Sequence, residues 1–168
     1  MKKYTLVIAA VMMLFSSGYS QIGLKTIRGK VGVIMPEDPW DVGFDIGAAV
    51  DMGEITKNLH LVPNIAYWSS GYSLDLGYLG SYDIGLSNFQ LGADVNYFFS
   101  DGLYAGGGLS MNFFGGDIDS DIKFGFDAMF GYIYKMKSFN IYTEARYNFI
   151  SDFNTMEIVA GIEFPMGK

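Results

Sequence analysis

The ionisable side chains of this 168-residue sequence can be sorted by the parity of their positions, because successive side chains of an extended segment point to opposite faces. One face of these extended segments collects acids and bases, and the other face is apolar. The strong bases on the polar face are Arg28, Lys30, Lys123 and Arg146, and the single histidine, His60, shares it. The acids on that face are Asp41, Asp45, Asp51, Asp94, Asp127, Glu144, Glu157 and Glu163. Opposite charges gathered in this way predict a paired polar network.

Arg146 is predicted to bridge two carboxylates of this network. The pairing register of the two strands is counted from the turn at residues 135–138, with Tyr134 placed opposite Phe139. That register puts Arg146 opposite Asp127 and leaves Glu144 two residues along the same face. Cross-strand neighbours of opposite charge attract each other, whereas an orphaned charge in a low-dielectric interior is costly. We therefore expect Arg146→Met to change the unfolding temperature and the heat-modified gel mobility.

A catalytic histidine–acid pair is one chemical alternative for the polar face. The counted register places His60 near Asp51, and an imidazole beside a carboxylate can act as a general base. A hydrogen-bonded interior histidine is the favoured interpretation, because His60 follows a short turn and faces inward.

The acidic repeat Asp117, Asp119 and Asp121 resembles the start of a calcium-binding loop. Its sixth position is Ile122 where an EF-hand has glycine, and its twelfth position is Ala128 where an EF-hand has glutamate. A solvated acidic loop is therefore expected, with weak divalent-ion binding as the alternative. We predict no metal site and no cofactor.

The element that positions these groups is clearest in residues 40–53, WDVGFDIGAAVDMG. Large apolar residues fall on one parity, and aspartate, glycine and alanine fall on the other. A period of two over this length predicts a strand, and small residues suit the crowded interior of a narrow closed barrel. The apolar face is then predicted to contact lipid and the polar face to line the lumen. The glycines at 106–108 lack the helix and lysine of a phosphate loop, so they are interpreted as glycines that let the barrel close.

The same alternation recurs along the chain and predicts eight antiparallel strands, each long enough to cross a membrane when tilted. A slip in parity predicts a β-bulge near Ser87 and Asn88, and Pro63 predicts a bulge or a local break. Residues 70–80 still alternate, so a twisted hairpin is expected to extend beyond the membrane. The strands are predicted at 26–35, 40–53, 59–69, 82–99, 103–113, 122–134, 139–149 and 156–164.

Aromatic residues collect near the outward ends of these strands, as the interfacial girdles of a membrane barrel require. The predicted girdle residues are Trp40, Tyr67, Tyr97, Tyr132, Tyr134, Phe139, Tyr147, Phe149 and Phe164.

Residues 1–20 predict a cleaved secretory signal, because Lys2 and Lys3 precede a short apolar run that ends in small residues. The run is too short to cross a bilayer as a helix. Removing these residues leaves one domain, 21–168, with nine bases against eighteen acids and no cysteine. This composition excludes a disulfide framework and disfavours nucleic acid as a partner.

In strand count and in the alternation of short and long connections, residues 28–164 resemble the small eight-stranded outer-membrane barrels, such as the OmpX-like proteins and the membrane part of OmpA. The strand at 156–164 looks like the C-terminal signal read by the barrel assembly machinery, although Pro165 and three further residues follow it. The resemblance implies a bacterial outer-membrane location and contacts with outer-membrane lipid and lipopolysaccharide. It also implies that both termini lie on the periplasmic side.

The sequence therefore predicts an all-β, eight-stranded, antiparallel up-and-down transmembrane barrel. We expect a monomer whose lumen is filled by side chains, in a structural or surface-interaction role. Two alternatives remain open: a narrow porin-like channel for small solutes or cations, and a soluble lipocalin-like barrel with its apolar face inward. A lipid-modifying enzyme is not expected, because no Ser/His/acid set lies at the outer rim.

Overall fold

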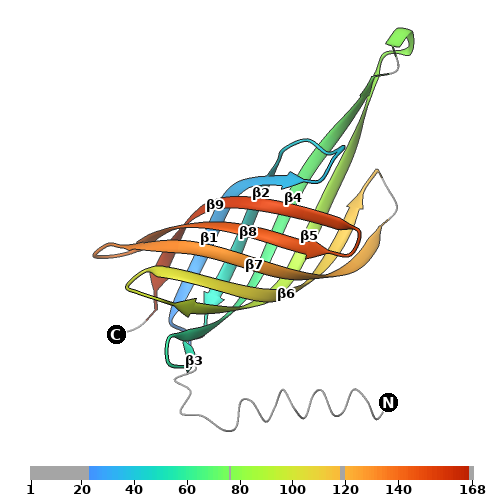
Figure 1. The fold of residues 1–168 in the computed structure, drawn as a ribbon. Coiled ribbons are helices and arrows are strands. Elements are labelled where there is room, and N and C mark those ends of the chain that lie inside the picture. Colours follow the sequence, from blue (N-terminus) through green and yellow to red (C-terminus); the bar gives the residue numbers. More distant parts are fainter. Residues whose placement is uncertain (1–22, 76, 118–119, 167–168) are drawn as a thin grey trace, which may run out of the picture.

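Nine strands are present in the computed structural model, which describes residues 23–75, 77–117 and 120–166 (Figure 1). They are β1 (Thr26–Pro36), β2 (Gly43–Asp51), β3 (Glu54–Thr56), β4 (Leu59–Asp75), β5 (Ser81–Phe98), β6 (Leu103–Gly116), β7 (Asp121–Lys135), β8 (Asn140–Ile150) and β9 (Phe153–Pro165). All neighbours are antiparallel, and the pairing of β1 with β9 closes the ring. Because β2 and β3 both pair with β4, they form one wall position, and the wall has the eight strands predicted.

The described residues contain no helix long and apolar enough to cross a bilayer. The predicted signal segment, 1–20, lies outside the described residues.

Side chains alternate between the lumen and the outside, as the period-two pattern predicts. In β8, buried and exposed residues alternate along the whole strand. On β7 the rings of Phe124, Phe126 and Phe130 are 70%, 50% and 55% exposed, whereas Asp127 is fully buried. A lipocalin-like barrel needs the reverse arrangement, with its apolar face inside. The soluble lipocalin-like alternative is therefore wrong.

The pairing of β4 with β5 is continuous along the whole hairpin, so the β-bulge predicted near Ser87 and Asn88 is wrong. The parity slip has another cause. Leu86 is buried in the lumen, whereas Tyr82 and Ile84 share its parity but belong to the part of β5 that extends past the barrel. Apolar residues therefore occupy both parities of one regular strand.

The irregularity predicted at Pro63 lies in the neighbouring strand. Pro63 pairs with Ala93 in the unbroken β4–β5 ladder. On its other side, the β2–β4 ladder ends at the pair Ala49–Asn64, and the register shifts within β3. A proline has no N–H to donate, so it is tolerated beside such a gap.

The register of β7 with β8 differs from the predicted one. Tyr134 pairs with Ile141, two residues beyond its predicted partner. Arg146 consequently lies opposite Met129 instead of Asp127. A shift by an even number of residues keeps every side chain on its predicted face, so the lumen residues are unaffected.

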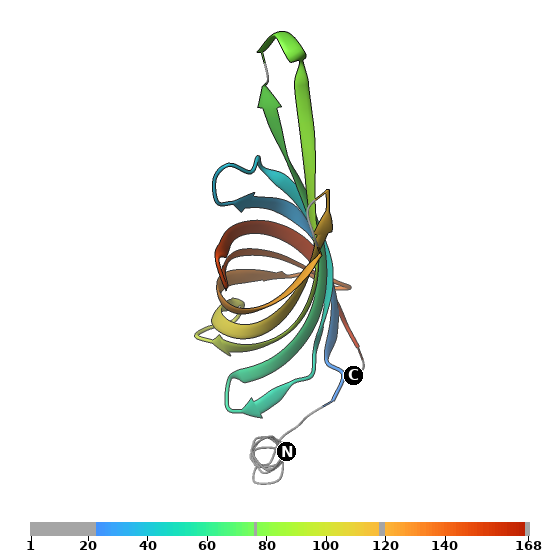
Figure 2. The same cartoon turned by 90° about the vertical axis from the view of Figure 1, so that its right-hand side faces the viewer.

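The two ends of the barrel differ in shape (Figures 1 and 2). At the loop end, defined by the described residues 37–42, 71–75, 77–85, 117, 120–123 and 151–152, β4 and β5 leave the wall together as the predicted hairpin. The short 3₁₀ helix η1 (Gly77–Leu79) lies at its tip. At the turn end, defined by residues 23–25, 52–58, 99–102, 136–139 and 166, the connections are short and both ends of the described chain are found.

Candidate functional site

Arg146, on β8, is the centre of a buried cluster of ion pairs. Its Nη2 lies 2.7 Å from Asp94 Oδ2 and 3.0 Å from Glu144 Oε1. Its Nη1 lies 3.6 Å from Asp127 Oδ2. The two carboxylates that sequence reasoning assigned to Arg146 are therefore both beside it, and Asp94 is a third that it did not assign. One guanidinium group joins β5, β7 and β8 through the lumen.

Neutral side chains donate hydrogen bonds to the same three carboxylates, which matters because a buried carboxylate without donors is strongly destabilising. The donor–acceptor pairs are Ser110–Asp127 at 3.2 Å, Gln90–Asp127 at 3.3 Å, Asn64–Asp94 at 2.9 Å and Tyr104–Glu144 at 2.7 Å. Each carboxylate around the guanidinium thus also has a neutral partner.

Lys30, on β1, forms a second cluster in the lumen. Its Nζ lies 2.9 Å from Asp45 Oδ2 on β2 and 3.0 Å from Glu157 Oε2 on β9. Asn148 Nδ2 donates to Glu157 Oε1 at 2.8 Å. The cluster therefore ties the first strand to both of its neighbours.

Arg28 forms a third cluster, nearer the turn end. Its Nε donates to Glu163 Oε2 at 2.6 Å, and its Nη2 lies 3.6 Å from Asp51 Oδ2. The guanidinium carbon lies 5.5 Å from the centroid of the Tyr142 ring, within the range of a cation–π contact. His60 Nδ1 lies 2.9 Å from Asp51 Oδ2, so the histidine is where the counted register placed it.

Two residues assigned to the polar lumen lie outside this network. Lys123 is near the loop-end rim, and its Nζ is 3.9 Å from the exposed Asp121. Asp41 is exposed at the same end. Both errors have one cause. Parity predicts the face on which a residue lies but not its position along the barrel axis, and both residues lie at the end of the wall.

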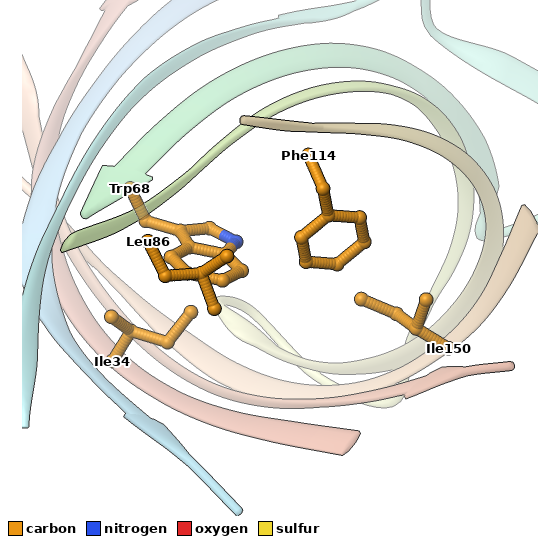
Figure 3. Close-up of a cluster of buried hydrophobic side chains, with 5 residues drawn as sticks. All are labelled: Ile34, Trp68, Leu86, Phe114 and Ile150. Atoms are coloured by element: carbon orange, nitrogen blue, oxygen red, sulfur yellow. The ribbon is translucent and has the colours of Figure 1, made fainter. Parts of the chain in front are cut away.

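An apolar layer crosses the lumen near the loop end, and sequence reasoning missed it (Figure 3). The Trp68 ring is fully buried, stacks on Phe153 with centroids 6.0 Å apart, and meets Phe114 edge-on at 5.8 Å. The sequence did contain a signal for this layer: near the loop end, the lumen-facing positions of the strands hold bulky apolar residues, whereas further along they hold small or polar ones. The buried members of this loop-end layer are Ile34, Trp68, Leu86, Phe114 and Ile150.

Trp40 was predicted as a girdle residue, and this is wrong. The ring is partly buried, packs against the loop-end layer and meets Tyr72 edge-on with centroids 6.4 Å apart. The wall strand β2 begins only at Gly43, so the chain at Trp40 is already part of a loop and its ring turns inward.

A second apolar layer lies toward the turn end. Tyr104, Ile133, Tyr142 and Val159 form this turn-end layer, and Phe98 packs against it. Beyond it, a cavity of about 750 Å³ opens at the turn end, lined partly by Arg28 and His60. Between the layers, a cavity of about 20 Å³ beside Arg146 has room for roughly one water molecule. The lumen is therefore filled by apolar side chains on both sides of the Arg146 cluster.

Glycines on one strand make room for large lumen side chains on the next. A Cβ built on Gly131 would lie 2.4 Å from the Tyr104 ring, and one built on Gly161 would lie 2.4 Å from the Tyr142 ring. The small residues on the lumen side of the strands therefore leave space that large side chains of neighbouring strands occupy.

Gly131→Val is expected to lower the free energy of unfolding by about 1–3 kcal/mol, as overpacking does. The added methyl groups displace the Tyr104 ring and break its hydrogen bond to Glu144. Equilibrium unfolding in urea, with the barrel in detergent micelles, measures the effect. Gly29→Ala is the matched control, since a Cβ there meets nothing within 4 Å. Equal losses in the two variants would contradict the explanation.

Exposed and partly exposed aromatic rings form bands at two heights on the outer wall. Near the loop end, Phe44–Tyr67, Phe89–Phe113 and Phe126–Phe149 are neighbouring pairs, with centroids 6.1, 6.2 and 6.1 Å apart. Near the turn end the exposed rings are Tyr97, Phe99, Tyr132, Tyr134 and Phe164. The predicted girdle residues Tyr67, Tyr97, Tyr132, Tyr134, Tyr147, Phe149 and Phe164 are all exposed, whereas Phe139 is only partly so.

No group of three His, Cys, Asp or Glu side chains in the described ranges is arranged to hold a metal ion. Of the acidic repeat, Asp119 lies outside those ranges, and the Asp117 carboxylate instead accepts a hydrogen bond from the backbone N–H of Gly85 at 2.8 Å.

No family model and no curated protein matches this sequence. The solved structure of Neisserial surface protein A (NspA) is similar: its TM-score is 0.65 at 14% identity, over 84% of this chain and 96% of that one. The chain has the fold of the small eight-stranded outer-membrane β-barrels. A designed transmembrane β-barrel and Ail, the attachment invasion locus protein of Yersinia pestis, match with TM-scores of 0.49 and 0.48 at 16% and 12% identity. These two matches cover 88% and 85% of this chain, and in each case 99% of the matched chain.

Proposed function

We propose that this chain is a monomeric bacterial outer-membrane protein whose filled lumen holds the barrel together and whose β4–β5 hairpin is a surface for binding a partner outside the cell. One observation carries the proposal: an apolar outer wall surrounds an ion-paired interior, and a single long hairpin stands clear of that wall (Figure 2). In this proposal, residues 1–20 direct export, and the barrel assembly machinery inserts the chain among outer-membrane lipid and lipopolysaccharide.

The outer wall supports membrane residence. Exposed side chains along the wall are mostly aliphatic or aromatic, as with Val31, Leu109 and Phe124, which are 61%, 70% and 70% exposed. Such a surface is unfavourable in water and suited to hydrocarbon. The ring of strands leaves no backbone edge in the wall, which is the condition for crossing a bilayer with strands.

The hairpin supports a surface-interaction role. Beyond Gly71 and Gly85, the described residues of β4 and β5 pair only with each other. Each strand therefore presents an open edge of backbone donors and acceptors, and extended peptides can add to such edges. Tyr82 is 58% exposed and Tyr78 is completely exposed, so aromatic contact area accompanies the open edges.

The packed lumen argues against the channel alternative. We expect the purified barrel to give no single-channel conductance steps in planar bilayers, because the loop-end layer and the Arg146 cluster leave no continuous aqueous path. Conductance recorded in salt solution against a known porin as positive control measures this. Stable open-pore steps from the unaltered protein would show that the lumen is not sealed.

Cell fractionation followed by a heat-modifiability gel tests the proposed location. The expected result is an envelope protein whose unheated band migrates differently from its boiled band. A soluble periplasmic protein, or one whose mobility is unchanged by boiling, would contradict the proposal.

Chymotrypsin added to intact cells tests the exposure of the hairpin. Cleavage is expected at Tyr78 or Tyr82, because both residues belong to the part of the hairpin beyond the wall and both rings are exposed. The variant Tyr78→Ser/Tyr82→Ser is the matched control and should resist that cleavage. A hairpin cut only after cell lysis would place the loop end on the wrong side of the membrane.

A further inference from the structure

The exposed charges of this barrel are separated along its axis. Among the described residues, the outward-facing positions of the wall carry no Asp, Glu, Lys or Arg. Exposed charge is therefore confined to the two ends, and the ends have opposite signs.

Lysines dominate the turn end. Lys25 precedes β1, Lys57 lies in the β3–β4 turn, and Lys135 and Lys137 lie at the β7–β8 turn; all four are exposed. They come from three separate segments, so they are distributed around the rim. The exposed acids among the described residues of this end are Glu54 and Asp101, and Asp101 already pairs with Lys135.

Acids dominate the loop end. The described residues there include eight acids, at positions 37, 38, 41, 75, 83, 117, 121 and 152, and one base, Lys123. A surface with this charge repels anionic headgroups. Attraction of anionic phospholipid headgroups by exposed lysines is therefore expected at the opposite end.

Aromatic rings adjoin the turn-end lysines on the outer wall. Tyr97, Tyr132, Tyr134 and Phe164 are 42%, 47%, 59% and 52% exposed, and they lie on strand ends next to the turns that carry the lysines. Rings at this depth rest at a membrane–water interface, and lysines just beyond them reach the headgroup phosphates.

We propose that the turn-end rim is a docking surface for anionic phospholipid headgroups of the leaflet that surrounds it. This inference rests on the proposed membrane function. A soluble anion in the turn-end cavity fits less well, because the four acids Asp51, Glu54, Asp101 and Glu163 outnumber the three strong bases Lys25, Arg28 and Lys135 that line it. Lys57 and Lys137 do not line that cavity, so the membrane leaflet can meet them from outside, away from the buried carboxylates.

Lipid retention measured by mass spectrometry tests the proposal. The full-length barrel is folded into vesicles of phosphatidylcholine and phosphatidylglycerol in equal amounts, then extracted mildly, and the lipids that stay bound are quantified. Native protein should retain phosphatidylglycerol in excess by about fivefold, the preference that roughly one lysine contact gives. The variant Lys25→Gln/Lys57→Gln/Lys137→Gln should retain both lipids equally. These lysines are exposed and lie outside the ion-paired lumen, so the variant should keep its heat-modifiable band.

The matched control is Asp38→Asn/Asp75→Asn/Asp83→Asn, which changes the same number of charges at the loop end and should keep the native preference. The proposal would be overturned if the native protein showed no preference for phosphatidylglycerol, or if the lysine variant kept the preference of the native protein. Displacement of the lipid by 10 mM inorganic phosphate beyond the effect of matched sodium chloride would show a free-phosphate site and would also overturn it. Failure to fold into phosphatidylcholine vesicles alone would instead overturn the proposed membrane function.

Discussion

Arg146→Met is expected to lower the free energy of unfolding by about 3–5 kcal/mol, the usual effect of removing one partner from a buried ion pair. Methionine fills most of the volume of arginine but supplies no charge and no donor. Asp94, Asp127 and Glu144 would then face one another in the lumen with only neutral donors. Urea unfolding in micelles and the temperature at which the heat-modified band appears both measure the loss.

Two further variants make this result specific. Lys123→Met removes a base of the same face whose ion-pair partner among the described residues is the exposed Asp121, at 3.9 Å, so it should change stability by less than about 0.5 kcal/mol. Adding Asp94→Asn to Arg146→Met should restore part of the loss, because it removes one of the unpaired charges. If Arg146→Met unfolded like Lys123→Met, the guanidinium would not be the centre of the lumen.

Trp68→Ala is expected to cost about 3–5 kcal/mol, as large-to-small changes in a packed interior do. The Trp68 ring is fully buried between Phe114 and Phe153, and no lipid can reach the space it would leave. Its Nε1 has no hydrogen-bond partner in the described structure, so the loss comes from packing alone. Urea unfolding followed by far-ultraviolet circular dichroism is the appropriate measurement.

Phe130→Ala provides the comparison for Trp68→Ala. Its ring is 55% exposed on the outer wall, where lipid or detergent chains fill the space that a smaller residue leaves. Its effect should be less than half that of Trp68→Ala. A larger effect for Phe130→Ala would mean that the wall, not the loop-end layer, dominates the stability of the barrel.

Period-two alternation was sufficient to predict the strands and the direction of their side chains. Residues 103–113, for example, lie within β6, and Ser110 and Asn112, which share one parity of that strand, are both buried. The pattern is reliable because in a barrel one face meets apolar and the other polar surroundings along most of each strand.

Alternation could not predict heights or exact registers. The β7–β8 turn contains no glycine or proline to define its length, so the register was misjudged by two residues while every face stayed correct. Trp40 was placed by parity alone, although the chain there has left the wall. The loop-end layer brings together strand ends that are far apart in the sequence, and only the closed ring places them in contact.

The seam between β1 and β9 carries two of the interior ion pairs. Arg28–Glu163 and Lys30–Glu157 join residues separated by 135 and 127 positions, so neither can form before the last strand has been synthesised and brought against the first. A chain truncated before β9 would lose both glutamates together with the strand that pairs with β1. The ion pairs that later pair the interior charges can therefore form only in a chain that includes β9. Incomplete copies are expected to remain open and available to envelope proteases.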